Sequence, residues 1–133
     1  MCSVGLACAH SAEQSWSIDV SPGEARTVAD DVVNVVKSEL PPGQTMVHIV
    51  PAEPERGLTQ VLQNAFAEAG YAVSHDRVAQ GGSQHIRYLL TGDADGLALR
   101  VLVGPALQVN RWYSRDSSGI VSYSPVCVRR SDR

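Results

Sequence analysis

The sequence has little of what defines several large classes of protein. Its 133 residues are enough for one hydrophobic core but too few for two. It has no apolar run near the roughly 20 residues that a transmembrane helix needs. Basic residues are also scarce, since 11 Lys and Arg stand against 14 Asp and Glu, a net charge of −3. This balance excludes a general nucleic-acid binder, which needs a basic surface to displace counterions.

Cysteine is present, but not in a pattern that forms a disulfide framework. The count of three is odd, and Cys2 and Cys8 crowd the N-terminus. Cys127 stands between Val126 and Val128 in an apolar strand pattern, so we predict that it is a small core residue. With 44% hydrophobic and 19% charged residues, the chain has the composition of a folded globular domain rather than a disordered one.

The first ten residues are apolar, small and without charge, like the last part of a secretory signal. Gly5-Leu6-Ala7-Cys8 resembles the lipobox of bacterial lipoproteins, in which the cysteine receives the lipid. We therefore predict lipid attachment at Cys8, with residues 1–15 as a remnant of the signal and a flexible tether. The alternative is an unstructured tail with two incidental thiols.

Charge is unevenly distributed along the chain. Six of the 11 basic residues lie in residues 100–133, together with only two of the 14 acidic ones. Arg129 and Arg130 belong to this basic C-terminal part. Two interpretations remain open: a basic edge that meets an acidic partner, or a solvated strand end and tail.

Two amphipathic helices are predicted in the first half. Ser21 and Glu24 enclose Pro22 in the pattern of a capping box, which begins a helix. Its apolar face recurs at spacings of three and four, before Pro41 ends it: Ala25, Val28, Ala29, Val32, Val36 and Leu40. The second helix follows Gly57 and has its own inner face: Leu58, Val61, Leu62, Ala65, Phe66 and Ala69. Gly70 stands where a left-handed C-cap is favoured.

Strands make up the remainder. Short strands are predicted at 16–20, 45–50 and 71–73. From residue 71 the apolar period is two, with a loop at 75–84, alternation again from Ile86, and turns at 92–96, 104–105 and 117–119. Three hairpin connections in succession predict an antiparallel meander, and Pro125 places the final strand at an edge or a bulge. The predicted fold is one α+β domain over residues 16–130, with two amphipathic helices packed on a mostly antiparallel sheet.

Groups that could catalyse a reaction or hold a metal are few. We expect His48, in the middle of a strand, to be half-buried and hydrogen-bonded. His75, Asp76 and His85 bracket a glycine-rich loop, but no Cys-x-x-Cys or His-Glu-x-x-His spacing supports a metal site there. The stretch Asp93-Ala94-Asp95-Gly96 begins like a calcium loop but lacks the later oxygen ligands, so it predicts a hairpin turn. We expect no catalytic residue, no metal and no cofactor.

The aromatic residues of the sheet half admit two interpretations. These residues, with arginines beside them in the sequence, are Tyr88, Trp112, Tyr113 and Tyr123, with Arg87, Arg111 and Arg115. They fill the core and pair across strands, or they form a platform for a peptide, a glycan or a single-stranded nucleic acid. Consecutive strand residues point to opposite faces, so one of Trp112 and Tyr113 must face outward. The predicted partner-binding residues are Trp112, Tyr113, Arg111, Arg129 and Arg130.

The order of several short segments resembles the TrbH family of conjugal transfer lipoproteins over roughly residues 25–130. The matching segments are Leu40-Pro41-Pro42, Ala69-Gly70-Tyr71-Ala72-Val73, Ile86-Arg87-Tyr88-Leu89-Leu90, Leu99-Arg100-Val101, Val103-Gly104 and Val126-Cys127-Val128-Arg129-Arg130. None of them is a catalytic motif, so the resemblance depends on their order and spacing.

The resemblance implies a non-enzymatic component of a plasmid-type conjugative type IV secretion system. Such proteins are periplasmic lipoproteins anchored at the outer membrane, with a domain similar to the short N-terminal domain of secretins and TonB-dependent receptors. Partners would be other secretion-channel proteins, with a homo-oligomeric ring as one arrangement, a membrane reached through the lipid at Cys8, and no nucleic acid. We expect exposed strand edges, foremost Tyr123 to Arg130, to pair with neighbours. Two alternatives remain: a stand-alone periplasmic glycan- or peptide-binding domain, or a small hydrolase using His75, Asp76 or His85.

Overall fold

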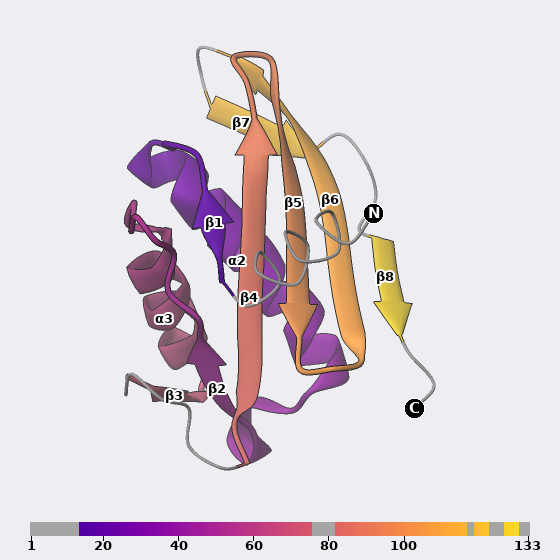
Figure 1. Ribbon diagram of the computed structural model, residues 1–133. Coiled ribbons are helices and arrows are strands. Elements are labelled where there is room, and N and C mark those ends of the chain that lie inside the picture. The colour runs from indigo at the N-terminus through magenta and orange to yellow at the C-terminus, as the bar shows by residue number, and fades with distance from the viewer. Residues whose placement is uncertain (1–13, 76–81, 117–118, 123–126, 131–133) are drawn as a thin grey trace, which may run out of the picture.

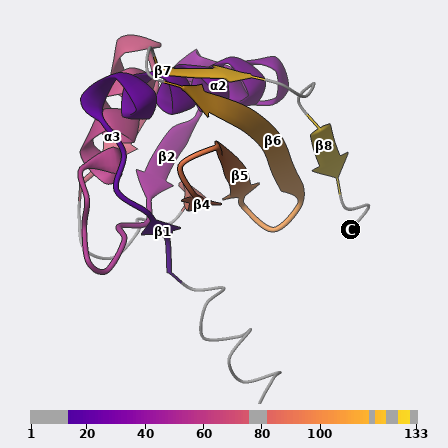
Figure 2. The same ribbon diagram turned by 90° about the horizontal axis from the view of Figure 1, so that it is seen from above.

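The computed structural model describes residues 14–75, 82–116, 119–122 and 127–130. In chain order the elements are β1 (Trp16–Ser17), α2 (Pro22–Glu39), a 3₁₀ turn (Pro42–Gln44), β2 (Met46–Ile49), α3 (Leu58–Glu68), β3 (Ala72–Ser74), β4 (Gln84–Gly92), β5 (Gly96–Val103), β6 (Leu107–Asp116), β7 (Gly119–Ser122) and β8 (Cys127–Arg130). The two helices lie on one side of a curled sheet (Figures 1 and 2). The described part of the chain therefore has the predicted α+β architecture.

The start of α2 and the ends of both helices have local causes that the sequence predicts. At the start of α2 the Glu24 amide donates to Ser21 Oγ at 3.1 Å, and the Ser21 amide donates to Glu24 Oε1 at 2.9 Å, which confirms the capping box. Leu40, which precedes Pro41, is the last residue to donate back into α2, through its amide to the Val36 carbonyl. After α3, Gly70 has φ +101°, a left-handed conformation that a side chain disfavours.

The sheet is antiparallel in its second half and parallel at one margin. Strands β4, β5, β6 and β7 form the predicted meander, with each strand antiparallel to the next. At the other margin, β2 lies between β3 and β4 and is parallel to both, and β1 is also parallel to β4. The ten-residue β6 pairs with β7 along its second half and with β8 along its first half.

The hydrophobic core lies between the sheet and the helices. Alternate residues of the central strands point into it, among them Tyr88, Leu99 and Tyr113, each at most 3% exposed. They pack against the predicted inner faces of α2 and α3, where Val28, Val32, Val36, Leu58, Leu62 and Phe66 are at most 1% exposed. Burial of one continuous apolar layer is what joins the two helices to the meander.

Two sequence-based expectations are wrong in this region. Cys127 is an exposed free thiol rather than a core residue, because β8 pairs Cys127 with Asn110 and Val128 with the buried Val109. Val128 therefore takes the core-facing position. The strand expected over 16–20 is limited to Trp16–Ser17, and its buried residue is Ser17 while Trp16 is exposed.

Several predictions concern residues outside the part that the structure describes. These are lipid attachment at Cys8, the position of Asp76 beside His75, the aromatic Tyr123 and the strand break at Pro125. Neither α2 nor α3 is long and apolar enough to span a bilayer.

Candidate functional site

The side of the sheet away from the helices is covered by no described helix, and we call it the open face. Strand alternation turns every second residue of the sheet toward it, and directly paired residues share a face. From the strand registers, its residues include Trp16 of β1, His48 of β2, His85, Arg87, Leu89 and Thr91 of β4, Ala98, Arg100 and Leu102 of β5, Gln108, Asn110, Trp112, Ser114 and Asp116 of β6, and Cys127 and Arg129 of β8.

The open face carries both tryptophans of the chain. Trp112 is 56% exposed and Trp16 is 41% exposed, and they are the exposed large hydrophobic residues of the described chain. The expectation that one of Trp112 and Tyr113 faces outward is confirmed, since Tyr113 is 1% exposed. The Tyr113 hydroxyl donates to Asp31 Oδ2 at 2.6 Å, and burial together with this contact raises the pKa of Tyr113.

The strand registers place the two tryptophans on one continuous surface. Trp16 pairs with Leu89, Leu89 with Arg100 and Arg100 with Asn110, so these residues form a row across four strands. Trp112 pairs with Ala98 and lies diagonal to Arg100. Three strand spacings separate β1 from β6, so the surface is about 14 Å wide between the tryptophans.

A hollow of about 290 Å³ lies on this surface. Its lining includes Leu89 and Ala98, which are apolar, and Arg100, Asn110 and Trp112, which offer hydrogen-bond donors. The lining thus combines an aromatic wall, a cation and an amide around an apolar floor, which are groups suited to apolar contact and hydrogen bonding.

The arginines of the sheet differ in their pairing according to the face on which they lie. On the helix side they pair with carboxylates of α2: Arg111 with Asp31 at 3.4 Å, Arg115 with Glu24 at 2.8 Å, and Arg130 with Glu39. On the open face, Arg87, Arg100 and Arg129 form no ion pair within the described residues. The buried Nε of Arg87 on the open face and that of Arg111 on the helix side both have no hydrogen-bond partner within the described residues.

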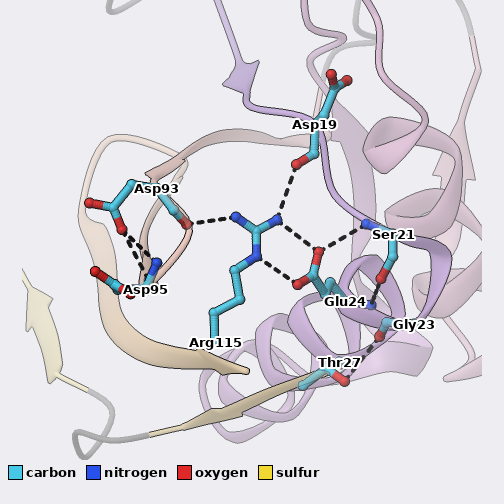
Figure 3. A network of polar contacts seen from close by, with 9 residues as sticks. Asp19, Ser21, Gly23, Glu24, Thr27, Asp93, Asp95 and Arg115 are labelled. Atoms are coloured by element: carbon cyan, nitrogen blue, oxygen red, sulfur yellow. Dashed lines mark hydrogen bonds and ion pairs between the residues drawn. The ribbon is translucent and has the colours of Figure 1, made fainter. Parts of the chain in front are cut away.

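Arg115 is the centre of the most connected polar cluster on the helix side (Figure 3). Its Nε donates to Glu24 Oε2 at 2.8 Å, and one terminal nitrogen donates to Glu24 Oε1 at 3.0 Å. The other terminal nitrogen donates to the Asp93 carbonyl at 2.7 Å. These bonds join the end of β6 to the start of α2 and to the β4–β5 turn. The hydrogen bonds from Arg115 hold the pKa of Glu24 below its ordinary value, against the opposing effect of burial.

The predicted partner-binding residues therefore do not form one surface. Trp112 and Arg129 lie on the open face, and Tyr113, Arg111 and Arg130 lie on the helix side, where each contacts an acidic residue of α2. No motif or spacing in the sequence marks Trp16, Leu89 and Arg100 as site residues. Only the register of β1, β4 and β5 relates them to Trp112.

The histidines do not assemble into a catalytic or metal-binding group in the described chain. His48 is 6% exposed, more buried than expected, and its ring centroid lies 5.7 Å from that of the exposed His85. His75 is exposed just beyond the end of β3. Among the described residues no cluster of three His, Cys, Asp or Glu side chains could hold a metal ion.

Comparison with known proteins gives one match. A family model described as conjugal transfer protein TrbH matches residues 8–132. No curated protein and no solved structure matches the chain significantly.

Proposed function

Since this chain belongs to the TrbH family of conjugal transfer proteins, we propose that it is a non-enzymatic component of a conjugative type IV secretion system, acting in assembly of the mating-pair channel. The observation that carries the proposal is the match over residues 8–132, which includes every described element. Its partners are then other proteins of the same transfer system. The stand-alone glycan- or peptide-binding domain receives no support from the family match.

The geometry of the described residues fits a protein that acts by docking. The chain offers an open sheet face with two exposed tryptophans, and it offers strand edges such as β8, which is paired with β6 along one side. Exposed tryptophan is enriched at binding hot spots, and an edge strand has free amides and carbonyls for a further strand. Pairing of such edges between copies would build a ring.

A mating assay tests this function. A donor cell that lacks the gene should transfer its plasmid far less often than the complemented donor, measured as transconjugants per donor. As a control, both donor strains should take up the plasmid by transformation and replicate it equally well. Unchanged transfer in the deletion strain would contradict the proposal.

We propose further that a lipid on Cys8 anchors the protein at the periplasmic side of the outer membrane. The support is the lipobox-like sequence before Cys8 and the family's conjugal transfer role. Replacement of Cys8 by Ser should release the protein from the membrane fraction, whereas Cys2→Ser should leave it there. Membrane retention of Cys8→Ser equal to that of the wild type would contradict the anchor and leave the transfer role untouched.

A further inference from the structure

We propose that the open face is a docking surface for an acidic segment of another protein of the transfer system, with an apolar side chain of that segment in the hollow between Arg100 and Trp112. The proposal deepens the docking function and rests on it. Four observations carry it: the placement of both tryptophans, the hollow, the arginines that have no ion pair among the described residues, and the absence of acidic residues from the rows that contain these arginines.

The rows of this surface from Arg87 to Trp112 carry charge of one sign, and Asp116, at the end of β6, lies on the same side of the sheet beyond them. Three rows of directly paired residues cross the strands here: Arg87–Leu102–Gln108–Arg129, Trp16–Leu89–Arg100–Asn110–Cys127 and Thr91–Ala98–Trp112. They contain three arginines and no acidic residue. The acidic residues of the β4–β6 meander lie beyond these rows, at the β4–β5 turn and the end of β6. Three guanidinium groups that form no ion pair with any described residue, on the open face of a chain with net charge −3, mark a place where a carboxylate gains interactions.

The guanidinium group also defines the chemistry of the partner. Its planar set of donors matches a carboxylate and binds it through two parallel hydrogen bonds. Arg100 lines the hollow, and the buried Nε of Arg87 has no partner within the described chain. An Asp or Glu of the partner would supply the acceptors that these donors lack.

The dimensions favour a polypeptide segment. The surface is about 14 Å wide between Trp16 and Trp112, which an extended chain of four or five residues spans. The hollow of about 290 Å³ has room for an apolar side chain, and Asn110 and Thr91 at its wall can bond to a peptide backbone. Lipid-binding surfaces carry clusters of about four to eight basic residues, and nucleic-acid binding needs a basic surface. Three arginines on an acidic chain fit a carboxylate segment better than either polyanion.

The chain supplies its own reporter for this contact. Both of its tryptophans lie on the open face, so its intrinsic tryptophan fluorescence reports on that face. The full chain is titrated with overlapping synthetic peptides that tile every other protein encoded by the same transfer region. We expect the peptides that change the fluorescence to share an excess of Asp and Glu with at least one large apolar residue.

Matched variants locate the contact. Arg100→Glu should weaken binding of those peptides about tenfold or more, measured by the anisotropy of a labelled peptide, and Trp112→Ala should do the same. Lys37→Glu makes the same change in charge at an exposed position of α2 and should weaken binding less than about threefold. Circular dichroism verifies that each variant is folded.

Each other result overturns the proposal. Binding by no peptide, binding only by basic or neutral peptides, or equal losses in Arg100→Glu and Lys37→Glu would show that the open face does not recognise acidic segments.

If anionic vesicles or single-stranded DNA bind through Arg100 and no peptide does, the surface binds that polyanion instead. If Trp112→Ala abolishes dimers detected by sedimentation and no peptide binds, a second copy occupies the face. Normal transfer by an Arg100→Glu donor would refute the docking surface alone, whereas normal transfer by the deletion strain would refute the proposed function.

Discussion

The two faces of the sheet are built from alternate residues of the same strands, yet they differ in the exposure of their aromatic residues and in the pairing of their arginines. The helix face holds the core, and its arginines are neutralised by carboxylates of α2. The open face exposes two tryptophans and three arginines that form no ion pair among the described residues. Because the helices cover the sheet on one side only, the residues of that side stabilise the domain, and the residues of the other side face outward, where a partner could contact them.

The difference is sharpest at Trp112 and Tyr113, which are neighbours in β6. Replacement of Tyr113 by Ala should lower the free energy of unfolding by about 3–5 kcal/mol, because loss of the buried aromatic ring leaves a cavity and Asp31 loses the hydrogen bond from the Tyr113 hydroxyl. Trp112→Ala should lower it by less than about 1 kcal/mol, because most of that side chain is already in water. Urea unfolding of both variants measures the contrast, and equal losses would show that the open face is part of the stabilising core.

Arginines on the two faces allow a second comparison. Arg115→Gln should destabilise the protein by about 2 kcal/mol, because Glu24, which is 7% exposed, loses its charged partner. Arg100→Gln should change stability by no more than about 0.5 kcal/mol. If the two substitutions have the same effect, the Arg115 cluster does not contribute to stability as its geometry indicates.

The Glu24–Arg115 pair also predicts a pH dependence that belongs to the helix face. The pKa of Glu24 lies below its ordinary value of 4.5 in the folded state, so its contribution to stability is complete above that pH and is lost as the pH falls through the folded value. The stability difference between the wild type and Arg115→Gln should therefore shrink as the pH falls below about 4.5.

Unfolding in urea at a series of acidic pH values measures this difference. Arg130 likewise lowers the pKa of Glu39, but that pair is intact in both proteins and cancels in the comparison. A difference that stays constant with pH would mean that Arg115 acts through something other than the Glu24 carboxylate.

The smallest expected effect concerns Cys127, which the structure places on the open face. In a variant with Cys2 and Cys8 replaced by Ser, a maleimide should label Cys127 in the folded protein at nearly the rate seen in denaturant, and Cys127→Ser should change stability by no more than about 0.5 kcal/mol. If labelling requires denaturant, Cys127 is buried in the folded protein and the sequence-based expectation of a core residue is correct.

Sequence alone was sufficient wherever structure depends on neighbours along the chain. Ser21 and Glu24 determine the start of α2, Pro41 prevents its continuation, and Gly70 ends the turn after α3. The period of two and the acidic turn at 92–96 likewise predict the β4–β5 hairpin, where the Asp93 amide donates to the Gly96 carbonyl at 3.0 Å. Each of these features involves residues only a few positions apart, so local composition is enough to define it.

Strand pairing over long sequence distances required the tertiary structure. A shift of one residue in register moves a whole strand to the opposite face, so no local pattern could show that Cys127 pairs with Asn110, or that Trp16 lies in one row with Leu89 and Arg100. The same pairing decides which arginines meet carboxylates of α2 and which remain on the open face. The sequence by itself determined the helices, the hairpins and the family, and the register of distant strands decided which side chains form one surface.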